Sequence, residues 1–270
     1  MDKTVLILGA SGTVGAAVFR QLSRWEDMKV FGTYFSSVQK DTSSMIRFSV
    51  EFPDDICSVL EQVRPDIVIS SLRGDFEKQL TVHEITAKYL VDNNGKLVYL
   101  STANVFDGSF DRPYYESDTP VSCSDYGRFK IQCEELLRDI MGERAAVLRL
   151  PFVWGRNSPR LRAVQEGCKA GKLEVYTDFS CNHASDLQIA DFIGWVIRED
   201  KCGVFHVGTT DVTDYPRFIE QLIAEIGVKS PELAARRVSG VMAVLSERND
   251  VPEHLKWDSR RLIRYLCGRE

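Results

Sequence analysis

Short apolar runs alternate along the first half of the chain with longer segments in which apolar residues recur every three or four positions. The short runs are typical of buried strands and the longer segments of amphipathic helices. We expect strands at residues 3–8, 29–33, 46–50, 65–69, 97–100 and 145–150, with helices between them, at about 16–22, 53–63 and 76–93 and from Tyr126 onward. Strands that alternate with helices predict an α/β fold with a parallel, doubly wound sheet and right-handed crossovers.

The pattern loosens after Leu150. We expect a loop at 151–155 and a tail of short pieces through Glu270. Between them we expect helices at 161–170, 187–198 and 215–226 and strands at 173–176 and 203–207. We therefore predict a nucleotide-binding domain at 1–150, to which the strand and helix at about 187–208 return. Residues 151–186 and 209–270 would form a smaller, interleaved C-terminal lobe that binds substrate, with a ligand cleft between lobe and sheet.

Three glycines, Gly9, Gly12 and Gly15, follow the first predicted strand and precede the first predicted helix. In that context the first glycine permits a tight turn, the second lets the backbone approach a diphosphate, and the third allows close helix–strand packing. The helix N-terminus adds oriented N–H donors for the anion. Together these features predict a Rossmann-type dinucleotide site.

The residues after the second predicted strand bear on the choice of dinucleotide. A domain that prefers NAD usually carries an acidic residue there for the ribose hydroxyls, and residues 30–40 contain none. Tyr34 lies at this strand end, and Ser36, Ser37 and Lys40 could meet a 2′-phosphate. The sequence therefore favours NADPH as cofactor and leaves NAD open.

A second candidate constellation lies between Thr102 and Lys130. Thr102 follows the predicted strand at 97–100, and Tyr126 and Lys130 are four residues apart at the start of a predicted helix. At that spacing two side chains share one helix face. An ammonium beside a phenol favours the phenolate and brings its pKa toward neutrality. We therefore expect Tyr126, Lys130 and Thr102 to form a proton-donating set at a carbonyl oxygen.

Composition excludes several other classes of function. The chain of 270 residues carries a net charge of −5 and no basic block, which argues against nucleic acid as a partner. No apolar run reaches the roughly 18 residues of a membrane span, and no signal peptide is evident. Seven cysteines without a Cys-x-x-Cys pair predict free thiols in the cytoplasm, and four scattered histidines predict no metal site.

The glycine turn, Thr102 and the Tyr126-x-x-x-Lys130 pair occur in the order found in the extended short-chain dehydrogenase/reductase superfamily, which the whole chain resembles. It looks most like the branch of sugar-nucleotide-binding proteins that contains dTDP-4-dehydrorhamnose reductase. The segments that carry this resemblance are Ser101-Thr102, 105–108, 113–118, Tyr126-Gly127, 149–155, Asp191-Phe-Ile and Lys256-Trp-Asp.

The resemblance implies a role for each matched residue. Tyr126 would protonate the substrate carbonyl, Lys130 would hold the nicotinamide ribose, and Thr102 would bind the substrate oxygen. The implied cofactor contacts are Gly9, Ser11, Gly12, Thr13, Val14, Gly15, Tyr34, Ser36, Ser37, Ser49, Val50, Ser70, Ser71, Leu72, Tyr126, Lys130, Pro151 and Val153. The implied substrate contacts are Thr102, Asn104, Val105 and Trp154. The implied reaction is reduction of a 4-keto group on a nucleotide-linked deoxysugar.

Several positions depart from the family pattern. Ser49 stands where Asp is usual, Ser70-Ser71 where Asn-Ala is frequent, and Ala103-Asn104 where this branch tends to have Asp-Tyr. His83 replaces a helix Asn that supports the proton relay, and could either carry protons or be a structural histidine. Residues 73–83 match poorly.

These departures leave alternatives open. One is a nucleotide-sugar epimerase or dehydratase, although Ala103 and Asn104 occupy the positions where dehydratases add carboxylates. Another is a non-catalytic, NAD(P)-binding subunit like the regulatory beta subunit of methionine adenosyltransferase, which resembles the same branch. A homodimer is the default expectation for the assembly.

Overall fold

The computed structural model describes residues 3–36 and 43–269. Seven parallel strands form its central sheet in the spatial order β10-β6-β5-β4-β1-β2-β3. These strands are β1 (Lys3–Leu8), β2 (Met28–Tyr34), β3 (Met45–Arg47), β4 (Ile67–Ser70), β5 (Lys96–Thr102), β6 (Ala145–Leu150) and β10 (Gly203–His206). The predicted doubly wound α/β sheet is thereby confirmed.

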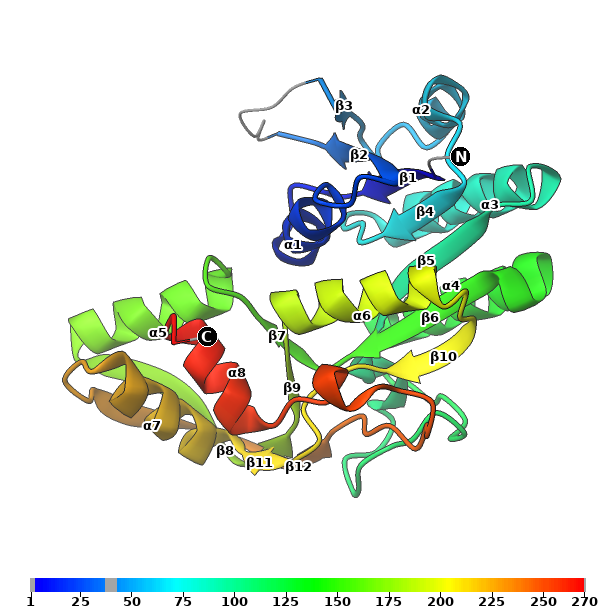
Figure 1. Ribbon diagram of the computed structural model, residues 1–270. Coiled ribbons are helices and arrows are strands. Elements are labelled where there is room, and N and C mark those ends of the chain that lie inside the picture. The colour runs from blue at the N-terminus through cyan, green and yellow to red at the C-terminus, as the bar shows by residue number, and fades with distance from the viewer. Residues whose placement is uncertain (1–2, 37–42, 270) are drawn as a thin grey trace.

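Helices cover both faces of this sheet (Figure 1). One face carries α1 (Thr13–Leu22) and α6 (Asp186–Arg198), and the other carries α2 (Asp55–Val63), α3 (Phe76–Asp92) and α4 (Asp125–Met141). The strands supply both faces because their side chains alternate: in β1, Val5 and Ile7 join one hydrophobic core while Leu6 and Leu8 join the other. The near-continuous apolar runs of the sequence follow from burial on both sides.

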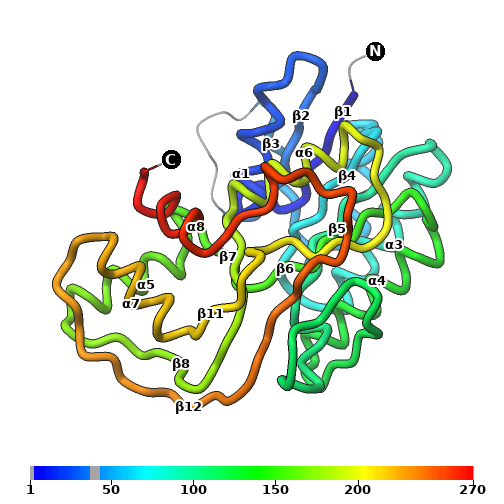
Figure 2. The backbone as a smooth tube through the Cα atoms, turned by 60° about the horizontal axis from the view of Figure 1, so that its bottom comes forward, coloured from blue at the N-terminus to red at the C-terminus, as the bar shows by residue number. Residues whose placement is uncertain are grey.

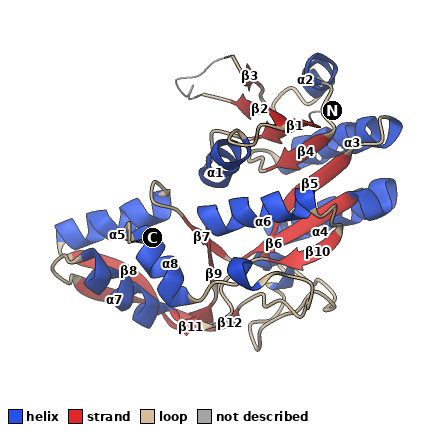
Figure 3. Ribbon diagram, viewed as in Figure 1, coloured by secondary structure: helices blue, strands red, loops and turns tan. Residues whose placement is uncertain are grey.

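The remaining elements build a smaller lobe beside the carboxyl ends of the sheet strands (Figure 3). It contains α5 (Pro159–Ala170), α7 (Tyr215–Ile226), α8 (Ser259–Leu266), and two small sheets with the orders β11-β8-β12 and β7-β9. Their strands are β7 (Phe152–Trp154), β8 (Lys172–Cys181), β9 (His183–Ser185), β11 (Thr213–Asp214) and β12 (Glu232–Met242). Three short 3-10 helices complete the described chain, at Ala103–Phe106, Gly142–Arg144 and Glu253–Leu255.

Two predictions for the C-terminal part were wrong. Residues 152–154 form β7, which pairs with β9, rather than a loop. The tail contains the long strand β12, which runs parallel to β8 along the outer edge of the lobe (Figure 2). The pairing of β12 shifts register between Arg237 and Gly240, and Gly240 has a φ of +125°. This irregularity breaks the alternation by which a strand is recognised in sequence.

The helix α6 and the strand β10 return to the sheet after the chain has passed through part of the lobe. β10 pairs with β6 as the edge strand, and α6 packs in the same core as α1. The lobe has a hydrophobic core of its own, which includes Trp154, Phe179, Phe218 and Trp257. Because the chain passes between sheet and lobe after β6, after β9 and again after β10, the walls of the space between them come from distant parts of the chain.

Candidate active site

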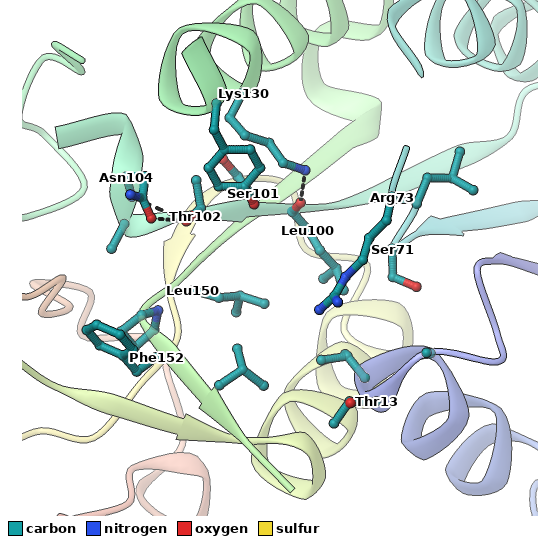
Figure 4. Close-up of a pocket in the computed structure, with 18 of the residues that line it drawn as sticks. Thr13, Ser71, Arg73, Leu100, Ser101, Thr102, Asn104, Lys130, Leu150 and Phe152 are labelled. Carbon is teal, nitrogen blue, oxygen red and sulfur yellow. Dashed lines mark hydrogen bonds between the residues drawn. The ribbon is translucent and has the colours of Figure 1, made fainter. Parts of the chain in front are cut away.

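A cavity of about 590 Å³ opens at the carboxyl ends of the sheet strands, between the sheet and the lobe. Its walls come from the start of α1, the segments after β4 and β5, the start of α4, and the lobe elements β7, α5 and β12. Ligands bind at this edge in open α/β folds. Figure 4 shows 18 of the residues that line it.

The glycine turn presents bare backbone to this cavity. Gly9 has a φ of +81°, and its carbonyl oxygen accepts a hydrogen bond from the N–H of Gly12 at 3.1 Å. A Cβ on Gly15 would lie 2.2 Å from the Gly9 oxygen, so the start of α1 is packed directly on the turn. At Gly12, which lines the cavity, the nearest atom to such a Cβ is 3.4 Å away. The cradle therefore fits a group that needs close approach to the backbone, as a diphosphate does.

Tyr126 and Lys130 line the same cavity because α4 begins where it does. Ser124 caps the helix by accepting a hydrogen bond from the N–H of Gly127, and Asp107 accepts hydrogen bonds from the residues at 122–124. A Cβ on Gly127 would lie 2.3 Å from the carbonyl oxygen of Asn104. The first turn of α4 is therefore held against the segment after β5, which carries Thr102.

The pKa of Tyr126 is raised rather than lowered, which corrects the expected effect of its neighbouring ammonium. Tyr126 is 40% exposed, but partial burial of its phenol raises this pKa, while hydrogen bonding with Thr102 and the charge of Arg73 oppose the rise. The Nζ atom of Lys130 lies 5.9 Å from the centre of the Tyr126 ring and donates instead to the carbonyl oxygen of Leu100 at 2.9 Å (Figure 4). The phenol therefore keeps its proton at neutral pH, as a proton donor requires.

Lys130 is buried, and burial lowers its pKa to about 8. Its Nζ lies 4.5 Å from the centre of the Tyr99 ring, and the charge of Arg73 lowers its pKa further. Thr102 accepts a hydrogen bond from the N–H of Asn104 at 3.2 Å, and its hydroxyl lies 3.1 Å from the Asn104 side-chain oxygen. Tyr126, Lys130 and Thr102 thus meet at one wall of the cavity.

Most of the residues predicted for the site line the cavity. They are Gly12, Thr13, Val14, Gly15, Ser71, Leu72, Thr102, Asn104, Tyr126, Lys130, Pro151 and Val153. Gly9 and Ser11 shape the glycine turn without lining the cavity. Four others, Tyr34, Ser36, Ser49 and Val50, lie after or at the end of β2 and β3, and Ser37 and Lys40 lie outside the described residues.

Three predicted site residues are buried away from the cavity. Val105 and Trp154 are fully buried in hydrophobic clusters, and Trp154 donates its ring N–H to His183. Ser70 is hydrogen-bonded to His83 at 2.7 Å. Burial lowers the pKa of His83 to about 3, so this histidine is neutral at physiological pH. Its position supports the structural interpretation over a proton relay.

Several residues of the cavity wall were not predicted from the sequence. Among them are Arg73 and Gly74, Phe76 and Gln79 of α3, Phe152 of β7, Arg160 of α5 and Met242 of β12. Arg73 could have been found, because it directly follows Ser71 and Leu72 at the ligand-binding edge. Arg160 and Met242 lie far along the chain, in elements whose place at the cavity depends on the folded lobe.

The described lining of the cavity carries three charged residues, Arg73, Lys130 and Arg160, and all three are basic. The whole chain is acidic, with a net charge of −5. A cavity with this charge favours anionic ligands. Within residues 3–36 and 43–269, no group of three or more His, Cys, Asp or Glu side chains could hold a metal ion. Nor does that part of the chain include a helix that could span a membrane.

The sequence is similar to a protein family and to several known proteins. Residues 75–250 match the profile of the family described as "RmlD substrate binding domain". The chain is 25% identical over 240 residues to the "Probable low-salt glycan biosynthesis reductase Agl14" of Haloferax volcanii, covering 82% of this chain and 79% of that protein. It is 33% identical over 165 residues to methionine adenosyltransferase 2 subunit beta of Mus musculus, covering 57% of this chain and 48% of that protein.

Solved structures share the whole fold. The dTDP-4-dehydrorhamnose reductase of Yersinia enterocolitica superposes with a TM-score of 0.82 at 19% identity, covering 100% of both chains. The dTDP-4-dehydrorhamnose reductase of Bacillus anthracis, solved in complex with NADP, superposes with a TM-score of 0.76 at 18% identity, covering 99% of both chains.

Proposed function

Because the chain belongs to the RmlD substrate-binding-domain family, we propose that it is an NADPH-dependent reductase of a nucleotide-linked 4-keto-6-deoxysugar. The observation that carries this proposal is the meeting of Tyr126, Lys130 and Thr102 in one basic cavity with the glycine turn. A reductase needs a proton donor within reach of the dinucleotide site, and this cavity holds residues suited to both tasks.

Each residue of the cavity wall has a role in the proposed reaction. A bound NADPH supplies hydride to the keto carbon. Gly12 and Thr13 would hold the diphosphate at the start of α1, and Pro151 and Val153, which line the same cavity, would lie near the nicotinamide ring. Thr102 orients the keto oxygen by hydrogen bonding, and the neutral phenol of Tyr126 donates its proton to that oxygen. Lys130, which lines the same cavity, would hold the nicotinamide ribose.

The choice of NADPH rests on the residues that follow β2. That segment offers Ser36 and no acidic residue between 30 and 40, which suits a 2′-phosphate better than two free ribose hydroxyls. The NADP complex of the Bacillus anthracis protein supports the same choice. Relatives of the same fold also bind NAD, as the Bordetella bronchiseptica enzyme solved with NAD+ does.

The experiment is to follow NADPH oxidation by the purified chain with a panel of nucleotide-linked sugars. The panel contains dTDP-4-dehydrorhamnose, other 4-keto-6-deoxysugars linked to dTDP, GDP and UDP, and dTDP-glucose as a sugar without the keto group. Turnover of one or more keto sugars, with none for dTDP-glucose, supports the reductase. NADPH binding without turnover of any keto sugar would contradict it.

A second candidate is a non-catalytic NAD(P)-binding subunit. It is favoured by the similarity to methionine adenosyltransferase 2 subunit beta, of which this chain spans about half. Because the match covers 57% of this chain, a shared partner is a separate proposal. Gel filtration with a methionine adenosyltransferase catalytic subunit tests it: co-elution that survives Tyr126→Phe supports the regulatory subunit, and separate elution contradicts it.

A further inference from the structure

Arg73 stands at the carboxyl end of β4, in the segment that matches the family pattern poorly, and lines the cavity. Figure 4 shows its side chain extending into the cavity, between Lys130 and Thr13 in that view. Within residues 3–36 and 43–269, no side chain or backbone group forms a hydrogen bond or ion pair with its guanidinium. The positive charge of Arg73 lowers the pKa of both Tyr126 and Lys130, which line the same cavity.

The backbone that carries Arg73 is attached to the glycine turn. The N–H of Ser71 donates to the carbonyl oxygen of Leu8 at 2.9 Å, and the Ser71 hydroxyl donates to the carbonyl oxygens of Leu8 and Gly9 at 3.0 and 3.2 Å. A Cβ on Gly9 would lie 2.8 Å from the carbonyl oxygen of Ser71. The two segments therefore pack directly on one another, which keeps Arg73 close to the glycine turn.

The turn that follows Arg73 is equally well held. Gly74 has a φ of +132°, and a Cβ there would lie 2.6 Å from the side chain of Val50. The buried Gln79 donates from its side-chain amide to the carbonyl oxygen of Gly74 at 2.8 Å, and Asp75 caps α3 by accepting from the N–H of Lys78 at 3.0 Å. The backbone on both sides of Arg73 is thus fixed, while its guanidinium has no hydrogen-bond or ion-pair partner among the residues that the structure describes.

An unpaired guanidinium held beside an anion cradle calls for an anionic partner, since arginine binds phosphate through paired N–H donors. We propose that Arg73 binds the diphosphate of the dinucleotide from the side of the cavity opposite the start of α1. This inference rests on the proposed function, because that function supplies the dinucleotide as the ligand. The guanidinium would add a positive charge to the backbone N–H donors of the glycine turn. This assignment also distinguishes the two arginines of the cavity wall. Arg73 would bind the dinucleotide, and Arg160, in the lobe, would be available to the nucleotide-linked sugar.

The test measures dissociation constants by calorimetric titration with three probes: NADPH, NADH and ADP-ribose. All three contain the diphosphate, only NADPH has the 2′-phosphate, and ADP-ribose lacks the nicotinamide. The variants are Arg73→Ala, Arg73→Lys and, as a matched control, Arg138→Ala. Arg138 is an exposed arginine of α4, so its removal changes the net charge equally without touching the cavity.

We expect Arg73→Ala to weaken all three probes by a similar factor of about ten, equivalent to ~1.4 kcal/mol. Arg73→Lys should recover part of the loss, because it keeps the charge without the planar pair of donors. The loss should shrink as ionic strength rises, and Arg138→Ala should bind as wild type does. Thermal unfolding of the ligand-free Arg73 variants should match wild type, because the side chain is exposed and has no partner within residues 3–36 and 43–269.

Three results would overturn the proposal. Equal affinities in Arg73→Ala and Arg138→Ala would remove Arg73 from the site. A loss for NADPH alone would assign Arg73 to the 2′-phosphate. A wild-type chain that binds none of the probes would overturn the proposed function as well. A wild-type chain that binds them but reduces no sugar would overturn only the reductase and leave the result for Arg73 standing.

Discussion

The ammonium of Lys130 donates a hydrogen bond to the carbonyl oxygen of Leu100 at 2.9 Å. Lys130 belongs to α4 and Leu100 to β5, so this bond joins the helix that carries Tyr126 to the strand that ends at Thr102. Burying the charged ammonium costs more free energy than burying an uncharged side chain at the same position would. This relationship has a measurable consequence for stability.

The stability of the protein should depend on pH through Lys130. Burial lowers its pKa from 10.5 to about 8. Between these values the unfolded chain binds more protons than the folded one, so this group makes the free energy of unfolding rise with pH. We expect the difference between wild type and Lys130→Met to grow in favour of wild type by up to about 3 kcal/mol from pH 7.5 to 10.5. Urea unfolding of both proteins at several pH values measures it, and a constant difference would contradict the assignment.

The buried ion pair behind the site should be essential for stability. Arg149 on β6 and Glu134 on α4 are both buried, with 2.7 Å between Nη2 and Oε2, and the hydroxyl of Ser101 donates to the same carboxylate. Removing the carboxylate leaves a buried, unpaired guanidinium, so we expect Glu134→Ala to lower the free energy of unfolding by about 3–5 kcal/mol.

The control for this ion pair is Glu135→Ala, which removes the adjacent, exposed carboxylate of the same helix. It should change the free energy of unfolding by no more than about 0.5 kcal/mol. Denaturant unfolding of the two variants side by side gives the comparison. Similar losses in both would mean that the buried pair is not what stabilises α4 against the sheet.

Alanine substitutions at Gly12 and Gly15 should have different effects, one on NADPH binding and the other on stability. A Cβ at Gly15 would lie 2.2 Å from the Gly9 oxygen, and one at Gly12 would lie 3.4 Å from the same atom. We expect Gly15→Ala to lower the free energy of unfolding by about 1–3 kcal/mol through this overlap. Gly12→Ala should fold normally but bind NADPH more weakly, because its methyl group projects where the diphosphate needs the backbone. Unfolding and NADPH titration of both variants test this; normal NADPH affinity in Gly12→Ala would contradict the cradle.

Much of the sheet could be predicted because its strands are buried on both faces and read as continuous apolar runs. The glycine turn, Thr102 and the pair Tyr126 and Lys130 follow from local spacing, and they do line one cavity. These features depend on short stretches of chain and on the rule that strand ends share an edge. Spacing along the chain was enough to find them.

The parts that could not be predicted depend on contacts between distant segments. The short strand β7 exists because it pairs with β9, with Phe152 opposite His183, and Trp154 is buried because β7 packs into the core of the lobe. The raised pKa of Tyr126 results from partial burial of its phenol, which outweighs the hydrogen bond with Thr102 and the charge of Arg73. The spacing between Tyr126 and Lys130 predicts that they share a helix face, but it does not predict how deeply each side chain is buried.

A single-turnover measurement shows whether Tyr126 is the proton donor. Enzyme saturated with NADPH is mixed with the keto sugar that wild type reduces, and NADPH oxidation is followed in wild type and in Tyr126→Phe. Loss of a general acid should slow this step by about 10²–10⁴-fold. The NADPH dissociation constant should stay within about twofold, because the phenylalanine ring preserves the packing of α4. Oxidation at the wild-type rate in Tyr126→Phe would contradict the role of Tyr126 as proton donor.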